Sequence, residues 1–124
     1  MGIDIYARWK DQTEAEVSAQ YTGFSDRAGN VGYLREAYHG GPYATDFFLK
    51  EATKPPEYEA KIPSSVLYER LPATLELVKL RYKKIYDEDL KDGDPPLMAY
   101  VDFCELVARK EQETGELVTI IFSG

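Results

Sequence analysis

The sequence predicts a single α+β domain, in which a small mixed β-sheet carries an antiparallel helical hairpin on one face. Two observations predict this class. The N-terminal half contains short stretches with the alternating pattern of strands, whereas the C-terminal half contains two long amphipathic stretches typical of helices. The length of 124 residues is that of one ordinary domain, so we assign residues 1–124 to one unit.

Composition and charge exclude several classes of protein. Hydrophobic residues make up 44% of the chain and charged residues 30%, the balance of a soluble globular protein. The net charge of −7 argues against a nucleic-acid partner. No apolar stretch approaches the ~20 residues of a membrane span, and the N-terminus lacks a signal-peptide pattern, so we expect no membrane contact and a cytoplasmic location. The single cysteine excludes an intramolecular disulfide. We expect no cofactor and no metal.

The N-terminal elements begin with a strand over residues 3–10, where apolar and polar side chains alternate. Thr13 and Glu16 have the spacing of a capping box, which predicts a short helix that begins at Glu14 and stops before Gly23.

Glycines then punctuate residues 23–42, which predicts loops with a short element over 31–38. Tyr43, Thr45, Phe47 and Leu49 alternate with smaller or polar residues, which predicts a second strand.

The helices of the C-terminal half are marked more clearly. An apolar stripe at spacings of three and four predicts a helix over residues 72–86, separated by a break or kink at Pro72 from a preceding helical segment. Asp94 is a suitable N-cap and Gly115 a suitable terminator for a second helix over 95–114. The short connection predicts that the two helices pack as an antiparallel hairpin.

The last predicted strand, residues 117–122, is apolar on both faces, which is typical of a strand inside a sheet. One helical hairpin covers only one face of a sheet. Either residues 12–42 cover the other face or a second subunit does, and we expect a homodimer.

The densest polar and aromatic stretch runs from Tyr33 to Tyr43 and includes the only histidine. Histidine changes charge near neutral pH, arginine binds carboxylates or phosphates through its planar fork, and tyrosine offers a stacking face. The polar face of the first strand adds a phenol and a second guanidinium. A tight turn whose tyrosines cover the edge of the core is the structural alternative. The candidate binding residues are Tyr6, Arg8, Tyr33, Arg35, Tyr38 and His39.

Two other features resemble sites but fail on inspection. Cys104 lies on the apolar stripe of the second helix, so we expect a buried, inert thiol rather than a nucleophile. The acidic run from Asp87 to Asp94 resembles a calcium loop, but Asp92 and Met98 stand where glycine and glutamate are required. We interpret the run as a solvated loop between the helices.

Three functional hypotheses follow. We favour a non-enzymatic module that binds a small anionic ligand or a protein partner through the candidate residues. The alternative is a small enzyme acting on an anionic substrate, with His39 as general acid or base and Arg8 and Arg35 as an anion clamp. In the third, structural hypothesis, the tyrosines fill a subunit interface.

Segments spread over most of the chain carry a family resemblance. They are residues 2–9, residues 21–25, residues 32–40 (Gly32-Tyr33-Leu34-Arg35-Glu36-Ala37-Tyr38-His39-Gly40) and residues 71–77. With these segments the chain resembles a family of short uncharacterised bacterial proteins. The resemblance implies a bacterial cytoplasmic protein and assigns no catalytic residue.

Overall fold

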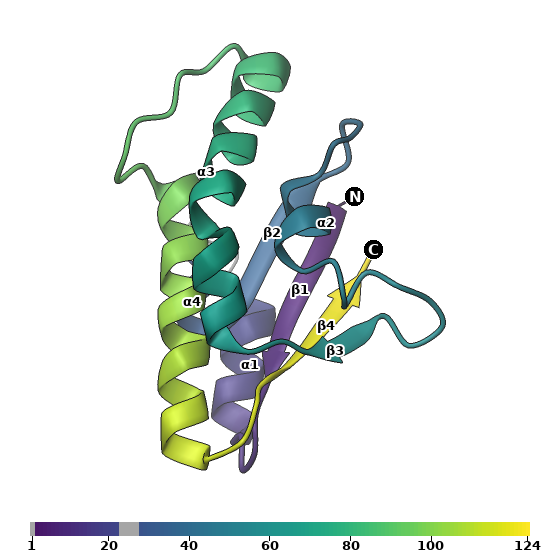
Figure 1. Ribbon diagram of the computed structural model, residues 1–124, viewed down its shortest axis with the longest axis vertical. Helices are drawn as coiled ribbons and strands as arrows, with labels where there is room; N and C mark the ends of the chain where they lie inside the picture. The colour runs from purple at the N-terminus through teal and green to yellow at the C-terminus, as the bar shows by residue number, and fades with distance from the viewer. Residues whose placement is uncertain (1, 23–27) are drawn as a thin grey trace.

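The computed structural model describes residues 2–22 and 28–124 and confirms the α+β class (Figure 1). The strands are β1 (Gly2–Arg8), β2 (Tyr33–Ala37), β3 (Glu59–Lys61) and β4 (Thr119–Ser123). The helices are α1 (Glu14–Thr22), the 3-10 turn η1 (Ala28–Val31), α2 (Ala44–Phe48), α3 (Ser64–Tyr86) and α4 (Pro95–Thr114). Part of the loop expected over 23–42 falls on residues 23–27, which lie outside the described residues.

The four strands form one sheet in the order β2-β1-β4-β3. Within residues 2–22 and 28–124 all the strand pairs are antiparallel, so the sheet is antiparallel rather than mixed. β4 lies between β1 and β3, which confirms that the last strand is interior to the sheet. Tyr6 on β1 pairs with Tyr33 on one side and with Ile121 on the other, so side chains at these positions share one face.

The two faces of the sheet have different surroundings. Ile3, Ile5 and Ala7 are buried in the core cluster that also contains Leu97 and Phe103 of α4. We call this helix-covered side the inner face. The opposite side, which carries the alternate residues of β1, is the outer face. Figure 1 shows the antiparallel hairpin of α3 and α4 lying along the β2 side of the sheet. The predicted helical hairpin is therefore confirmed.

The hairpin differs from the prediction at Pro72, because α3 runs without interruption from Ser64 to Tyr86. The break predicted at this residue is wrong. Pro72 is exposed. The hydroxyl of Thr74 donates a hydrogen bond of 2.8 Å to the carbonyl of Arg70, which adds a bond in the turn around the proline.

The second strand predicted over residues 43–49 is also wrong. Residues 44–48 form α2, and Ala44, Thr45 and Phe48 are buried. The main-chain N–H groups of Ala44 and Thr45 donate to the carboxylate of Glu36 at 2.8 and 3.0 Å. A side chain on β2 thus satisfies the first donors of α2, a contact between distant residues that the local alternation does not reveal.

The predicted helix ends are confirmed in α1 and α4. The N–H of Thr13 donates to the Glu16 carboxylate, and the N–H of Glu16 donates to the Thr13 hydroxyl, at 2.9 and 3.1 Å. Helix α4 follows Asp94 and ends at Gly115, whose φ of 74° is the left-handed conformation that glycine adopts without strain.

The turn η1 approaches α4 closely. A Cβ atom placed on Gly29 would lie 1.9 Å from the carbonyl oxygen of Ala99, so no side chain fits there. Also on α4, Cys104 is fully buried, as predicted, and burial raises the pKa of its thiol to about 12. A thiol with this pKa is protonated near neutral pH, which agrees with the expected inert cysteine.

An ion pair between Arg70 and Glu51 ties α3 to the segment that follows α2. The guanidinium donates to the carboxylate at 2.7 and 2.5 Å, and these bonds lower the pKa of Glu51 from 4.5 to about 2. A carboxylate whose pKa is lowered by folding stabilises the native state above its unfolded pKa, and the contribution is lost as the pH falls through the folded value.

We therefore expect the free energy of unfolding to fall between about pH 4.5 and pH 2 partly through Glu51. Urea unfolding at a series of pH values measures this slope. In Arg70→Met the part of the slope that belongs to this pair should be absent, and an unchanged slope would contradict the assignment. Lys83→Met is the control, because Lys83 and its partner Asp87 are largely exposed.

Candidate functional site

Four of the six predicted binding residues lie together on the outer face. The register pairs Tyr6 with Tyr33, and their ring centroids are 5.5 Å apart. The guanidinium of Arg8 lies 5.4 Å from the centre of the Tyr6 ring. Arg35 stands opposite Asp4 in the same register. Sequence reasoning alone could not bring the first strand and residues 33–35 together; antiparallel pairing does so.

Each of these cations already has a partner within the chain. Arg8 donates to the side-chain oxygen of Gln20 and, at 3.0 Å, to the hydroxyl of Tyr21. Arg35 donates to Asp4 at 2.8 Å.

The hydroxyl of Tyr33 donates to the same carboxylate at 2.5 Å. Burial, followed by this bond, raises the pKa of Tyr33 to about 12. The side chains of Arg8, Tyr33 and Arg35 therefore all have hydrogen-bond partners within the chain, as expected of residues that hold β1, β2 and α1 together.

The other two predicted residues lie elsewhere. Tyr38 packs edge-on against Tyr43, and His39 packs edge-on against Tyr86 of α3, with centroids 5.9 and 6.0 Å apart. His39 follows Ala37, which pairs with Gly2 at the start of β1. Arg8 is six residues farther along that strand, about 20 Å at ~3.3 Å per residue. The structure does not bring His39 and Arg8 together.

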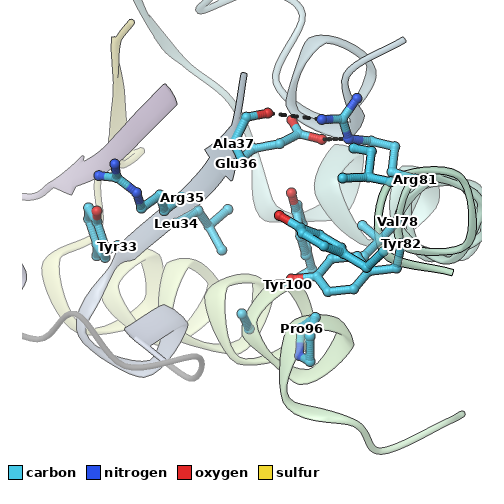
Figure 2. Close-up of a pocket in the computed structure, with 13 residues that line it drawn as sticks. Tyr33, Leu34, Arg35, Glu36, Ala37, Val78, Arg81, Tyr82, Pro96 and Tyr100 are labelled. Atoms are coloured by element: carbon cyan, nitrogen blue, oxygen red, sulfur yellow. Dashed lines mark hydrogen bonds and ion pairs between the residues drawn. The ribbon is translucent and has the colours of Figure 1, made fainter. Parts of the chain in front are cut away.

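A groove with a volume of about 340 Å³ lies on the inner side of β2 (Figure 2). We call it the β2 groove. Its sides are β2, the C-terminal half of α3 and the start of α4. The lining residues are Tyr33, Leu34, Arg35, Glu36, Ala37, Val78, Arg81, Tyr82, Ile85, Tyr86, Pro96, Ala99 and Tyr100.

A buried ion pair closes one end of the groove. Arg81 donates from Nε to Glu36 at 2.8 Å, and both side chains are less than one-tenth exposed. The two terminal nitrogens of Arg81 donate to the carbonyls of Ala37, Gly40 and Pro42 at 2.9, 2.6 and 3.1 Å. Figure 2 shows Arg81 reaching from α3 to the end of β2.

Glu36 also accepts hydrogen bonds from the N–H groups of Ala44 and Thr45 and from the Thr45 hydroxyl. Its carboxylate thus holds α2, the 38–43 turn and α3 in one arrangement. These bonds occupy both oxygens, which makes Glu36 a structural group rather than an available base.

The opposite wall of the groove is aromatic. Tyr82 and Tyr86 on α3 have ring centroids 5.1 Å apart. Tyr100 on α4 is 5% exposed, and burial raises the pKa of its hydroxyl well above the ordinary value. Tyr86, in contrast, is 51% exposed and stands at the rim. The groove therefore offers an aromatic wall, and the Tyr86 ring at its rim is accessible from solvent.

A smaller hollow of about 120 Å³ adjoins the groove, sharing Arg81 and Ile85 with it. His39, Lys84 and the exposed Leu80 line this hollow. Of the six residues predicted from the sequence, Tyr33 and Arg35 line the groove and His39 lines the smaller hollow. Tyr6, Arg8 and Tyr38 line neither.

Sequence reasoning missed Glu36, Arg81, Tyr82, Tyr86 and Tyr100 as site residues. Two of them carry a signal that could have been read. Arg81 is three residues after Val78 on the apolar stripe of α3, and Glu36 is two residues after the buried Leu34 on β2. Charged residues at two buried positions indicate a buried ion pair, because an unpaired buried charge is too costly.

None of the helices in residues 2–22 and 28–124 is long and apolar enough to cross a membrane. The same residues contain no group of three or more histidine, cysteine, aspartate or glutamate side chains that could hold a metal ion.

Comparison with protein-family models, with curated proteins and with solved structures finds no match.

Proposed function

We propose that the protein is a non-enzymatic binding module and that the β2 groove receives its ligand or partner. The observation that carries this proposal is the groove itself, whose volume of about 340 Å³ lies at the low end of the ~300–1,000 Å³ range of ligand pockets. Its tyrosine wall suits an apolar or aromatic group, since tyrosine buries a large area at little cost in side-chain entropy.

The polar groups in the groove support binding rather than catalysis. Glu36 and Arg81 are bonded to each other and to the main chain, so neither is positioned to exchange a proton with a ligand. The catalytic alternative requires His39 close to the clamp formed by Arg8 and Arg35. The separation of about 20 Å between His39 and Arg8 along the strands speaks against that arrangement.

Tyr86→Ala tests the proposal, with Tyr68→Ala as a matched control. Tyr68 is also on α3 and is 42% exposed, but it is not a groove residue. The probe is indole-3-propionate, an aromatic ring with a carboxylate, titrated against the full chain while amide signals are followed by NMR.

We expect the shifted signals to map to β2, α3 and the start of α4, and Tyr86→Ala to weaken binding about fivefold through the lost ring contact. Tyr68→Ala should bind as the unmodified protein does. Shifts confined to other surfaces, or equal affinities of the two variants, would contradict the groove as the site.

The homodimer expected from the sequence stays part of the proposal. The hairpin covers the inner face, whereas Ile121 and Tyr6 on the outer face are only half-buried. Burial of their remaining surface against a second copy would contribute to association. The ligand site and this face lie on opposite sides of the sheet, so dimerisation and binding are compatible.

A further inference from the structure

The open edge of β2 runs along the groove. β2 is the last strand on its side of the sheet, and the main-chain groups on its outer edge face away from β1. The register determines which residues these are. The N–H of Ala7 donates to the carbonyl of Gly32 at 2.8 Å, so the hydrogen-bonded pairs of this ladder are Ala7 with Gly32 and, two residues on, Ile5 with Leu34.

Arg35 therefore directs its main-chain N–H and C=O away from β1 and along the groove side of the strand. The neighbouring residue of the same set, Ala37, bears this out, because its carbonyl accepts a bond from Arg81 of α3. The side chains of Tyr33 and Arg35 point away from Arg81 and Tyr82, whereas those of Leu34 and Glu36 point toward the groove (Figure 2).

From this arrangement we infer that the groove takes an extended acidic peptide segment, which adds a strand beside β2. The inference rests on the proposed function and specifies its partner. The main chain of the segment bonds Arg35, and a large apolar side chain of the segment packs on Tyr82 and Tyr86. Open strand edges beside apolar pockets are bound by peptides in this manner elsewhere.

Charge indicates why the segment is acidic. Among the charged residues that line the groove and the adjoining hollow, Arg35 pairs with Asp4 and Arg81 pairs with Glu36, so Lys84 contributes the remaining positive charge. Lys79 and Lys83, on the same helix, pair with carboxylates. Lys84 has no ion pair with any of residues 2–22 or 28–124, so its charge is available to a carboxylate of the partner.

A second copy of the chain fits this edge less well. A copy that paired its own β2 edge here would bring its α3 and α4 against the same helices. A slender segment avoids that crowding, because it brings no helices of its own.

The experiment begins with a displayed library of random peptides, selected on the immobilised full chain. Binders are retained only when Tyr86→Ala weakens them and Tyr68→Ala does not. We expect the retained peptides to be rich in acidic residues around one large apolar residue. A selection that yields no groove-dependent peptide, or yields basic ones, would overturn the inference.

The strand-pairing step is tested on the peptide first. Two versions of a selected peptide carry N-methyl groups on alternate residues, one version on the odd and the other on the even positions. We expect one version to bind about tenfold more weakly and the other to bind nearly as the unmodified peptide does, since only one set of N–H groups faces β2. Equal binding of both versions contradicts strand pairing.

The same step is tested on the protein with Arg35→Pro and its control Arg35→Ala. Both variants lose the bond to Asp4, but only proline removes the N–H that faces the groove. Proline is tolerated on an edge strand, and the ladder with β1 does not use this N–H. Arg35→Pro should weaken peptide binding about tenfold relative to Arg35→Ala.

Lys84→Glu tests the charge. The substitution should weaken binding of the selected acidic peptide about tenfold and reduce the dependence of binding on salt. Lys83→Glu should change the affinity less.

The two proposals fail in different ways. In one outcome, binding of indole-3-propionate depends on Tyr86 while peptide binding is unchanged by Arg35→Pro and by the alternate N-methyl groups. In that case the groove is a small-ligand site and only the peptide inference is wrong. If neither probe depends on Tyr86, the proposed function fails as well.

Discussion

Replacing Arg81 with methionine is expected to lower the free energy of unfolding by about 3–5 kcal/mol. The substitution leaves the buried carboxylate of Glu36 without its charged partner and removes the donors to the carbonyls of Ala37, Gly40 and Pro42. The cost arises from buried polar groups that lose their partners, and it exceeds what the intact pair contributes relative to an apolar core. Urea unfolding followed by circular dichroism measures it.

Lys79→Met is the matched control, because it removes the same kind of charge from the same helix. Its partner Asp92 is 96% exposed, so the loss of stability should be much smaller than in Arg81→Met. Arg81→Lys retains the positive charge but not the planar guanidinium. Its free energy of unfolding should lie between those of Arg81→Met and Lys79→Met. Equal stability of Arg81→Met and Lys79→Met would show that the pair does not organise the end of the groove.

Gly29→Ala should destabilise the protein by about 3 kcal/mol, at the upper end of the cost of overpacking. The new methyl group would stand 1.9 Å from the carbonyl oxygen of Ala99 and 2.9 Å from its carbonyl carbon, so η1 and α4 must move apart. Because both contacts are with main chain, no side-chain rotation relieves the clash.

Thermal unfolding of Gly29→Ala and of Gly41→Ala gives the comparison. A Cβ on Gly41 would meet its nearest atoms at 3.8 Å or more, an ordinary contact, and that substitution should change stability by no more than about 0.5 kcal/mol. A Gly29→Ala protein as stable as the Gly41→Ala protein would contradict the close packing of η1 on α4.

Much of the fold could be predicted because local signals and the final structure agree. The capping box at Thr13, the alternation of β1 and the glycine at position 115 each act within a few residues of where they stand. The stripe that buries Cys104 likewise depends only on the period of the helix.

The failures occur where a distant residue decides the local conformation. The residues of α2 alternate as a strand does, but their first N–H groups are satisfied by Glu36. Pro72 would end an isolated helix, yet it sits exposed in a helix whose flanking residues Leu67 and Thr74 are buried, so packing on both sides holds the two halves in line.

The candidate site was predicted only in part, for a related reason. The aromatic and polar stretch around Tyr33 does border the groove, but its side chains alternate between two faces of β2. Sequence proximity therefore grouped Arg35 with His39, which the strand and the following turn direct to different surroundings. The other wall comes from α3 and α4, and only the tertiary fold places it opposite β2.

The two edges of the sheet differ in how they resist aggregation. β3 is a three-residue strand with exposed Glu59 and Lys61, and Pro55 and Pro56 precede it, so it gives another sheet little to extend. β2 is longer and buries Leu34, its Glu36 is held by Arg81 of α3, and α3 lies across the groove beside it. Loosening of α3, by heat or by loss of Arg81, would uncover Leu34 and the unpaired main-chain edge of β2. Aggregation of the chain should therefore begin at β2, and it should follow the detachment of α3 rather than global unfolding.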